Sequence, residues 1–287
     1  MTEDGKLLVG LIGAGIGRSL TPAMQEAEAA AQGLRLHYQL IDLDRSGRGP
    51  QALPMLITAA QAMGFAGLNI TYPCKQAVIP LLDALSDEAR TMGAVNTVVF
   101  EGGKATGHNT DGSGWRWGFE RALPGADLSR VVLLGAGGAG SAIAHSVCRM
   151  RADALVVIDS DNARAGALVA ELTRQYGAAR VSAGTDAAAA MQGASGLIHA
   201  TPTGMDKLPG LPLPAALLRP ALWVAEIVYF PLETALLKAA RSVGCRVVDG
   251  GTMAVGQALG AFELFTGCVA DATRIDAHFR RLIQERA

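Results

Sequence analysis

The segment VVLLGAGGAGSAIA, which begins at Val131, constrains the fold of this chain more than any other part of its sequence. Four apolar residues lead directly into Gly135-x-Gly137-x-x-Gly140 and then into small residues that suit a helix. In a dinucleotide-binding strand–turn–helix, the first glycine permits the tight turn and the second lets the backbone approach a pyrophosphate; the third lets the helix pack closely on the strand. The predicted cofactor loop is Gly135, Ala136, Gly137, Gly138, Ala139 and Gly140.

Asp159 ends the next apolar run and indicates which dinucleotide binds. A carboxylate at this position accepts hydrogen bonds from both ribose hydroxyls of NAD and repels the 2′-phosphate of NADP. Asp161 adds a second acid, and no cation follows before Arg164. We therefore expect NAD to be the preferred cofactor of a nicotinamide-dependent oxidoreductase. NADP remains an alternative, because Arg164 in the same site could offset the acidic charge.

Apolar runs alternate with helix-like segments along the whole chain, which predicts an α/β fold with mostly parallel sheets. The expected strands are Leu7–Gly13, Leu36–Leu43, Gly67–Ile70, Thr97–Glu101, Val131–Leu134, Leu155–Ile158, Leu197–Ala200, Leu222–Glu226 and Arg246–Val248. The expected helices are Pro22–Gln32, Ala52–Met63, Lys75–Leu85, Gly114–Ala122, Ser141–Arg149, Arg164–Gln175, Ala187–Ala190, Ala254–Thr266 and Ala272–Glu285.

The charge balance and the cysteines exclude several classes of partner. Lys and Arg total 25 and Asp and Glu total 26, so we expect neither nucleic acid nor an anionic membrane surface as a partner. The four cysteines form no CxxC pair and have no metal-ligand spacing with the histidines, so no metal is expected. No signal peptide or membrane-length apolar run is visible, and we expect a cytoplasmic protein.

A second glycine-rich loop, at Gly13–Gly17, also follows a strand-like run. Its third glycine falls too early to serve helix packing, and Ser19-Leu20-Thr21-Pro22 comes next. Thr21 before Pro22 fits a helix N-cap with proline at the first helical position. Alternatively, the hydroxyls of Ser19 and Thr21 contact a polyhydroxylated substrate. The spacing alone leaves both interpretations open.

Two further clusters are unusually rich in amides and hydroxyls. Asn69–Lys75 leaves a strand and is expected to place Lys75 at a helix start, where the helix dipole disfavours its charge. Gly93–Thr97 and Gly107–Gly112 bracket another strand with Asn, Thr and Asp111. A single Lys or Asp is usually a solvated surface charge, but the density of polar groups around both favours a site.

Seven segments, in this order along the chain, resemble the shikimate dehydrogenase family. They are SLTPAM, NITYPCK, GAVNT, NTDG, GAGGAG, ATPTGM and GTMAVGQALGAFELFTG, and they cover nearly the whole chain. The resemblance implies a three-layer α/β substrate domain, a doubly wound Rossmann domain for the nicotinamide cofactor, and C-terminal helices that return to the first domain. The implied boundaries are 1–112 with 253–287, and 113–252. A monomer or a homodimer is expected.

The resemblance also assigns the site residues. Lys75 and Asp111 fall on the catalytic pair, in which a partly desolvated lysine takes the proton of the substrate hydroxyl and the carboxylate orients it. The sequence leaves open which of the two carries the proton. The implied substrate-binding residues are Ser19, Thr21, Thr71, Asn96 and Gln257, with Tyr229 as a further contact. The residues implied at the nicotinamide end are Thr201, Met205 and Met253.

The expected substrate is shikimate, oxidised to 3-dehydroshikimate. Ser19-x-Thr21, where Ser-x-Ser is commoner, resembles members that also oxidise quinate to 3-dehydroquinate. Gln25, where a histidine is common, and Gly256, where a bulkier residue is usual, depart from the family pattern and put quinate in doubt. The alternatives are another two-domain dehydrogenase, of the methylene-tetrahydrofolate or amino-acid type, and a catalytically silent relative that senses dinucleotide. The silent relative predicts loss of Lys75 or Asp111, yet both are present.

Overall fold

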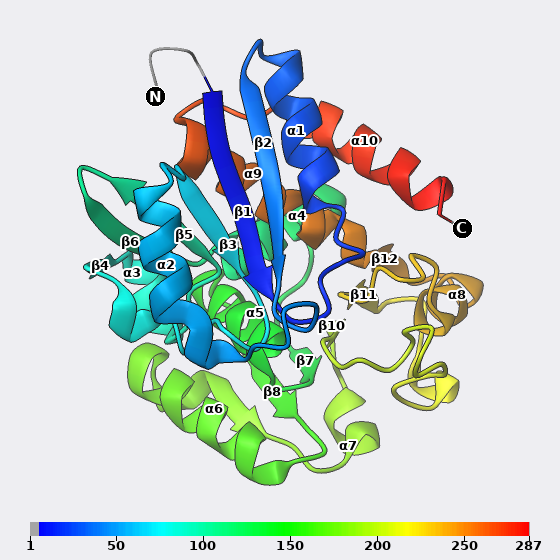
Figure 1. Ribbon diagram of the computed structural model, residues 1–287. Helices are drawn as coiled ribbons and strands as arrows, with labels where there is room; N and C mark the ends of the chain where they lie inside the picture. The colour runs from blue at the N-terminus through cyan, green and yellow to red at the C-terminus, as the bar shows by residue number, and fades with distance from the viewer. Residues whose placement is uncertain (1–5, 287) are drawn as a thin grey trace. The chain divides into compact units, whose positions relative to one another are not determined.

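The computed structural model describes residues 6–286, which form two compact units. One unit comprises residues 6–110 and 255–286, and the other comprises residues 111–254. Each contains a six-stranded sheet with helices on both faces (Figure 1). The α/β class, the second doubly wound sheet and the return of the C-terminal helices to the first unit confirm the predicted fold. Within residues 6–286, no helix combines the length and apolar character that crossing a bilayer requires.

The sheet of the first unit has the order β2-β1-β3-β5-β6-β4. Its strands are β1 (Lys6–Gly13), β2 (Arg35–Asp42), β3 (Gly67–Ile70), β4 (Ala84–Leu85), β5 (Thr97–Glu101) and β6 (Lys104–His108). Five of these six strands run in the same direction, and β5 runs antiparallel to its neighbours β3 and β6, so the mostly parallel prediction is confirmed for this sheet. The chain reverses between β5 and β6 at the two-residue connection Gly102-Gly103, where both residues have positive φ, as a tight hairpin turn requires.

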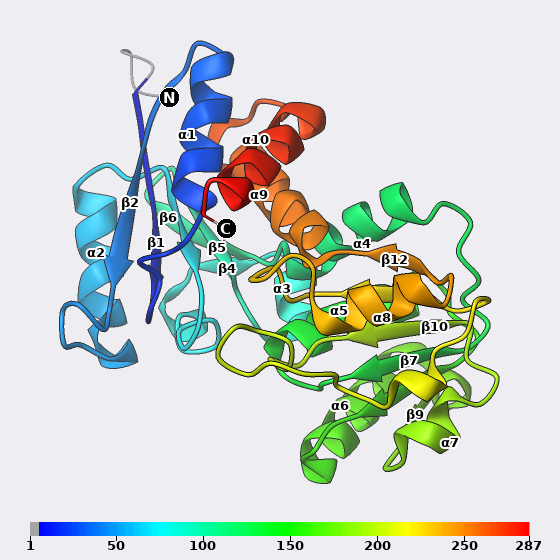
Figure 2. The same ribbon diagram turned by 90° about the vertical axis from the view of Figure 1, so that its right-hand side faces the viewer.

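Helices cover both faces of this sheet because β1 alternates its apolar side chains between them. Val9 and Leu11 pack with Phe265 of α9 (Gly250–Thr266), whereas Ile12 packs with Ile57 of α2 (Leu53–Ala62). Figure 2 shows α2 on one side of β1 and β2, with α1 (Thr21–Ala31) and α10 (Ala272–Gln284) on the other. A short helix α3 (Asp87–Met92) completes this unit.

The sheet of the second unit is parallel throughout, with the order β9-β8-β7-β10-β11-β12. Its strands are β7 (Val131–Leu134), β8 (Leu155–Ile158), β9 (Val181–Ala183), β10 (Gly196–His199), β11 (Trp223–Glu226) and β12 (Arg246–Val248). Its helices are α4 (Asp111–Ala122), α5 (Gly138–Arg149), α6 (Asn162–Tyr176), α7 (Ala187–Met191) and α8 (Ala235–Ser242). Counted along the chain this is the order 3-2-1-4-5-6, and ligands of such sheets bind where it reverses, between β7 and β10.

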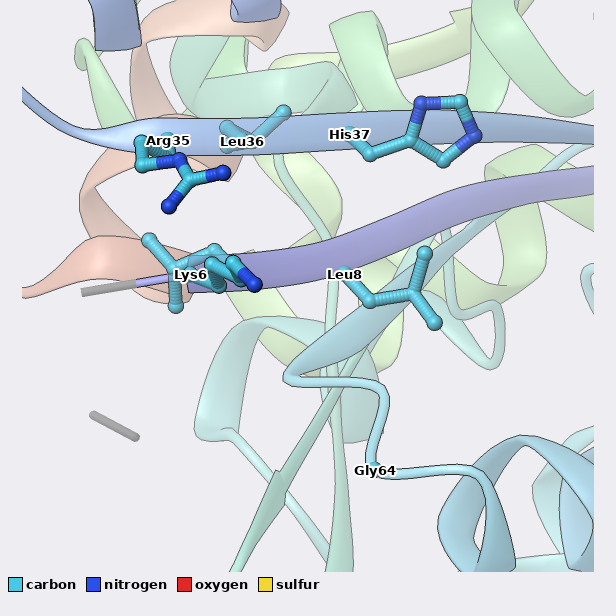
Figure 3. Close-up of a pocket in the computed structure, with 7 residues that line it drawn as sticks. Lys6, Leu8, Arg35, Leu36, His37 and Gly64 are labelled. Carbon is cyan, nitrogen blue, oxygen red and sulfur yellow. The ribbon is translucent and has the colours of Figure 1, made fainter. Parts of the chain in front are cut away.

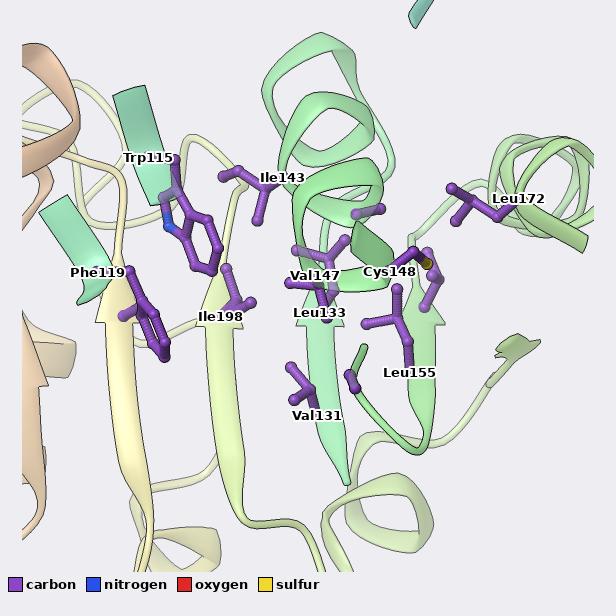
Figure 4. Close-up of a cluster of buried hydrophobic side chains, with 14 of the residues drawn as sticks. Trp115, Phe119, Val131, Leu133, Ile143, Val147, Cys148, Leu155, Leu172 and Ile198 are labelled. Atoms are coloured by element: carbon purple, nitrogen blue, oxygen red, sulfur yellow. The ribbon is translucent and has the colours of Figure 1, made fainter. Parts of the chain in front are cut away.

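Both faces of this second sheet are buried, which explains its unbroken apolar strands. Val131 and Leu133 of β7 point to the face covered by α4 and α5, where the rings of Trp115 and Phe119 stack at 4.9 Å (Figure 4). Val132 packs on the opposite face, with side chains from α7 and α8. The alternation of side chains therefore gives the sheet one apolar core on each face. The loops that follow the carboxyl ends of the strands are attached to this packed sheet.

Two local expectations are wrong. The predicted helix Lys75–Leu85 is a series of turns, a single 3-10 turn at Ile79–Leu81 and the short strand β4. Pro80 lies in the middle of the predicted helix and removes a backbone donor there. Thr21 is also not the N-cap of α1; Leu20 takes that position without a side-chain hydrogen bond, and Thr21 is the first helical residue.

Candidate functional site

The loop after β7 is shaped by glycines that have different tasks. Gly135 has φ +104°, and a Cβ there would lie 2.6 Å from the carbonyl oxygen of Ala200. A Cβ on Gly140 would lie 1.9 Å from the carbonyl oxygen of Gly135, so the close approach of α5 excludes any side chain. In contrast, a Cβ on Gly137 or Gly138 would meet nothing within 4 Å. These two glycines border open space at the start of α5.

This open space suits the pyrophosphate of a dinucleotide. Gly137 is the N-cap of α5 and offers no side-chain hydrogen bond to the first turn. The first N–H groups of a helix have no partner within it and lie at the positive end of its dipole. Backbone donors beside unfilled space are the arrangement that binds phosphate at helix N-termini. The residues present therefore fit a dinucleotide.

Asp159, at the end of β8, connects this loop to the start of α6. Its Oδ2 accepts a hydrogen bond from the N–H of Ala136 (2.7 Å), and its Oδ1 accepts one from the N–H of Asp161 (2.9 Å). The Nη1 of Arg164 lies 3.4 Å from Oδ1. Burial by itself raises the pKa of Asp159, but these N–H groups and Arg164 outweigh it and keep the pKa below its ordinary value. The carboxylate is therefore ionised. Its Oδ2 accepts one hydrogen bond here and can accept another.

Of the residues expected at the nicotinamide end, Thr201 and Met205 follow β10, and Met253 lies on α9 after β12. Thr201 lies beside the cofactor loop, because its Cγ2 is 3.1 Å from where a Cβ on Gly135 would be. Met205 is exposed, whereas Met253 is buried in the core with the α4 and α5 side chains. Tyr229 follows β11, and its ring centroid lies 4.7 Å from that of Phe230.

In the first unit, the expected substrate residues gather at one edge of the sheet. The N–H of Thr71 donates to the carbonyl of Ile12 (2.9 Å), and the N–H of Ile70 donates to the carbonyl of Asn96 (2.7 Å). The end of β1, the end of β3 and the start of β5 therefore meet at this edge. Lys75 follows four residues later in a turn, half-buried, and its carbonyl accepts the N–H of Val95 (2.9 Å). Since no helix starts there, the predicted dipole effect on Lys75 does not apply.

Asn96 organises the approach to Asp111. Its Nδ2 donates to Oγ1 of Thr110 (3.0 Å), and its Oδ1 accepts the N–H of Thr110 (2.8 Å). Asn96 and Thr110 are both buried. Asp111 comes next, at the first residue of α4, with only 3% of its surface exposed. Lys75 belongs to the first unit, and Asp111 is the first residue of the second unit.

Two other expected substrate residues lie on α1 and its approach, and a third lies on α9. The Oγ of Ser19 accepts the N–H of Thr21 (3.3 Å), and both side chains are half-buried. Gln257 is half-buried on α9. The fully buried Gln25 donates from Nε2 to the carbonyl of Ala258 (2.8 Å) and so fixes α9 next to Gln257.

A surface hollow of about 430 Å³ is separate from these residues (Figure 3). It is lined by Lys6, Leu7, Leu8, Arg35, Leu36, His37 and Gly64. Lys6 and Arg35 start β1 and β2, so the hollow lies at the amino ends of these strands. Ligands of open α/β sheets bind outside the carboxyl ends, and none of the expected site residues lines this hollow.

The chain is similar to known proteins over nearly its whole length. The family described as "Shikimate dehydrogenase substrate binding domain" matches residues 11–98. A protein of Streptomyces avermitilis named shikimate dehydrogenase (NADP(+)) is 55% identical over 284 residues, which is 98% of this chain and 97% of that protein. The chain belongs to the shikimate dehydrogenase family. A relative in Corynebacterium efficiens named quinate/shikimate dehydrogenase (NAD(+)) is 47% identical over 287 residues, covering 98% of this chain and all of that protein.

Among solved structures, the quinate dehydrogenase from Corynebacterium glutamicum in complex with NAD matches with a TM-score of 0.90. It is 44% identical, and the match covers 96% of this chain and 99% of that chain. Like other members of the shikimate dehydrogenase family, the chain is thus an NAD(P)-linked oxidoreductase. These two kinds of named relative differ in cofactor, so membership alone does not choose between NAD and NADP.

Three further polar residues near the expected site have no predicted role from the sequence. His199 and Glu226 were included in apolar strand runs, although each is a polar residue at the last position of a buried strand. A titratable group at the carboxyl end of a parallel strand is a signal that could have identified them. Thr110 belongs to the predicted polar cluster Gly107–Gly112 but has no predicted role, and its hydrogen bonds with Asn96 show that it holds this side chain.

Proposed function

We propose that this chain is a shikimate dehydrogenase that catalyses the reversible NAD(P)-linked oxidation of shikimate to 3-dehydroshikimate, with quinate as a second candidate substrate. The observation that carries the proposal is the chain's own set of site residues. Thr71, Lys75 and Asn96 gather at the edge of the first sheet, and the second sheet presents a dinucleotide loop at its switch point. Family membership supports the same reaction.

In this proposal the second unit, residues 111–254, holds the dinucleotide. The N–H groups at Gly137–Gly140 would bind the pyrophosphate, and Asp159 would accept the ribose hydroxyls. Thr201 and Met205 would border the nicotinamide, and Met253 would support it from the core. When bound, the nicotinamide supplies the hydride acceptor that oxidation of a secondary alcohol requires.

The first unit, residues 6–110 with 255–286, would bind the hydroxy-acid. The hydroxyls of Ser19 and Thr21 would hold its carboxylate. Its ring hydroxyls would be held by Thr71, Asn96 and Gln257 and by Tyr229, which belongs to the second unit. Lys75 and Asp111 would form the catalytic pair. One of them takes the proton from the reacting hydroxyl as the carbonyl forms, and returns it in the reverse direction.

We also propose that NAD is preferred over NADP. The support is the ionised carboxylate of Asp159, which is 6% exposed in its side chain and held at the end of β8. A 2′-phosphate placed there would meet a like charge at close range. Arg164, 3.4 Å from the same carboxylate, is already paired with it and so offers less to a phosphate. We further propose that the protein is cytoplasmic and acts as a monomer or homodimer.

A spectrophotometric assay at 340 nm tests the proposal directly. Purified protein is incubated with shikimate or quinate and with NAD or NADP, in all four combinations. The expected result is reduction of NAD with shikimate, and a lower rate with NADP. The proposed function is wrong if neither acid supports reduction of either cofactor. Reduction with quinate alone would keep the reaction class and replace the substrate.

A further inference from the structure

The last residues of β10 and β11 form a buried pair, His199 and Glu226. They are direct register partners on adjacent parallel strands, and Nδ1 of His199 lies 2.8 Å from Oε1 of Glu226. Neither side chain has exposed surface. Nε2 of His199 lies 2.5 Å from Oγ1 of Thr201. Burying such groups costs free energy that burying a well-packed apolar pair would not cost. The stability of the fold therefore does not explain the pair, and its hydrogen-bond partners indicate its role.

The direction of each hydrogen bond follows from the partners of Glu226. Its Oε1 also accepts the N–H of Ile227 (2.9 Å) and of Val228 (3.0 Å), so this oxygen is an acceptor and Nδ1 of His199 donates to it. Nε2 of that tautomer accepts the hydroxyl of Thr201. The same Oγ1 accepts the N–H of Thr203 at 3.3 Å. The hydroxyl of Thr201 is therefore held inward, and its Cγ2 is left against Gly135.

Glu226 also accepts hydrogen bonds from both ends of the segment 227–234, which contains Tyr229. Its Oε2 accepts the hydroxyl of Thr234 (3.0 Å), and Thr234 in turn caps α8 by accepting the N–H of Leu237 (3.3 Å). Both ends of this segment are thus fixed to one carboxylate. The path of the chain between β11 and α8 therefore depends on these hydrogen bonds of Glu226.

The topology indicates which half of a bound dinucleotide would lie near these residues. A doubly wound sheet consists of two mononucleotide-binding halves. Strands β7, β8 and β9 form the half that contains Asp159, and β10, β11 and β12 form the other half. Since a ribose-binding carboxylate belongs to the adenosine side, Thr201 and the segment 227–234 border the nicotinamide side.

We propose that His199 and Glu226 are positioning residues for the nicotinamide half of the cofactor, acting through Thr201 and the segment 227–234 without touching the cofactor themselves. This inference rests on the proposed use of NAD(P), and the experiment separates the two. The dissociation constants of NADH and of ADP-ribose, which lacks the nicotinamide, are measured by fluorescence titration and calorimetry for wild type and for His199→Asn. The Asn amide can replace Nδ1 toward Glu226 but cannot reach Thr201.

His199→Asn should weaken NADH binding by roughly fivefold or more, the equivalent of one lost hydrogen bond, and leave ADP-ribose binding within about twofold. Thr201→Val, which keeps the shape and removes the hydroxyl, should change the ratio in the same direction. The matched control is His145→Asn. His145 is equally buried in the same unit, but it lies on α5 and its ring contacts the hydroxyl of Tyr176 on α6, not Thr201. This control should leave the NADH to ADP-ribose ratio unchanged.

Equal weakening of both ligands would assign the pair a general structural role and overturn the inference, as would unchanged binding of both ligands in His199→Asn and Thr201→Val. If His199→Asn does not fold, Thr201→Val alone decides between these outcomes. Wild-type protein that binds neither NADH nor NADPH would overturn the proposed function, and this inference with it.

Discussion

Arg274 of α10 binds both carboxylate oxygens of Glu28, a residue of α1 whose side chain is fully buried. Its Nε lies 2.7 Å from Oε2 and its Nη2 lies 2.7 Å from Oε1. The N–H of Asp271 also donates to Oε1 at 2.9 Å. Burial raises the pKa of Glu28, but Arg274, this N–H and Gln32 outweigh it and lower the pKa from its ordinary value of 4.5. One carboxylate thus fastens the last helix of the chain to the first.

Arg274→Gln should reduce the free energy of unfolding, and by more than Arg280→Gln does, because it leaves a buried carboxylate without its cation. Urea denaturation at pH 7 measures the loss. Glu28 stabilises the folded state only while it is ionised, so the difference from wild type should shrink as the pH falls below 4.5 and through the lowered folded pKa. Arg280→Gln is the control on the same helix; its partly exposed pair with Asp276 should contribute less than about 1 kcal/mol. Equal losses in the two variants would show that the burial of Glu28 does not matter.

Lys75→Ala and Asp111→Asn should each lower kcat/KM for shikimate by roughly 10² to 10⁴, the contribution typical of a general acid–base group. Binding of NADH should stay within about twofold of wild type, because neither residue belongs to the dinucleotide loop. Lys104→Ala removes an exposed lysine of β6 in the same unit and should leave turnover unchanged. Near-normal turnover in Lys75→Ala would remove Lys75 from its assigned role.

The second sheet could be predicted from sequence more accurately than the first, for a physical reason. The strands Val131–Leu134 and Leu155–Ile158 have the predicted ends, because a strand buried on both faces is an unbroken apolar run between polar loops. Strand β6, with the sequence KATGH, has no such run and was missed. The Gly102-Gly103 turn before it was a visible hairpin signal.

The site was harder to predict than the fold. The glycine loop and the position of Asp159 after β8 are local patterns of spacing, so the sequence alone makes them candidates. The pairing of His199 with Glu226 depends on the register of two strands separated by 23 residues of intervening loop and turn, which no local pattern encodes. Likewise, the failure of the helix Lys75–Leu85 reflects Pro80 and the pairing of β4 with β6, a contact distant in sequence.

Asp159→Ala should raise the ratio of kcat/KM for NADP to that for NAD by roughly tenfold, as the like charge beside the 2′-position is removed. Steady-state rates with each cofactor at saturating shikimate give the ratio. Asp159→Asn keeps one acceptor for the N–H of Ala136 and removes the charge, so it should shift the ratio in the same direction with less loss of stability. If NADP use does not rise relative to NAD in either variant, the ribose contact is wrongly placed.

His145 should make the protein sensitive to mild acid. Burial, together with the nearby charge of Arg149, lowers the pKa of His145 from 6.5 to about 4. Because the folded-state pKa is the lower one, the unfolded chain binds a proton first as the pH falls. Stability that is complete above pH 6.5 is therefore lost progressively between pH 6.5 and 4. The loss from this one group should reach roughly 3 kcal/mol.

Denaturation of wild type and His145→Asn across this pH range tests the effect. The Asn amide can still meet Oη of Tyr176, which lies 3.2 Å from Nδ1, but it does not titrate. The stability difference between the two proteins should therefore change with pH below 6.5 and stay constant above it. Parallel curves over the whole range would mean that the pKa of His145 is the same in the folded and unfolded states, and would contradict the lowered value.

Gly137 and Gly140 should respond oppositely to the same substitution. Gly140→Ala places a Cβ 1.9 Å from the carbonyl oxygen of Gly135, so α5 must move, and we expect a loss of stability of several kcal/mol, roughly 3 or more. Gly137 has φ −73° and ψ −171°, which any residue adopts, and its Cβ would meet nothing within 4 Å. Gly137→Ala should thus fold with near wild-type stability yet bind NADH roughly tenfold more weakly, because its methyl group projects where the pyrophosphate approaches the backbone. Thermal denaturation and NADH titration of both variants separate the two effects. Unimpaired NADH binding by Gly137→Ala would place the pyrophosphate elsewhere.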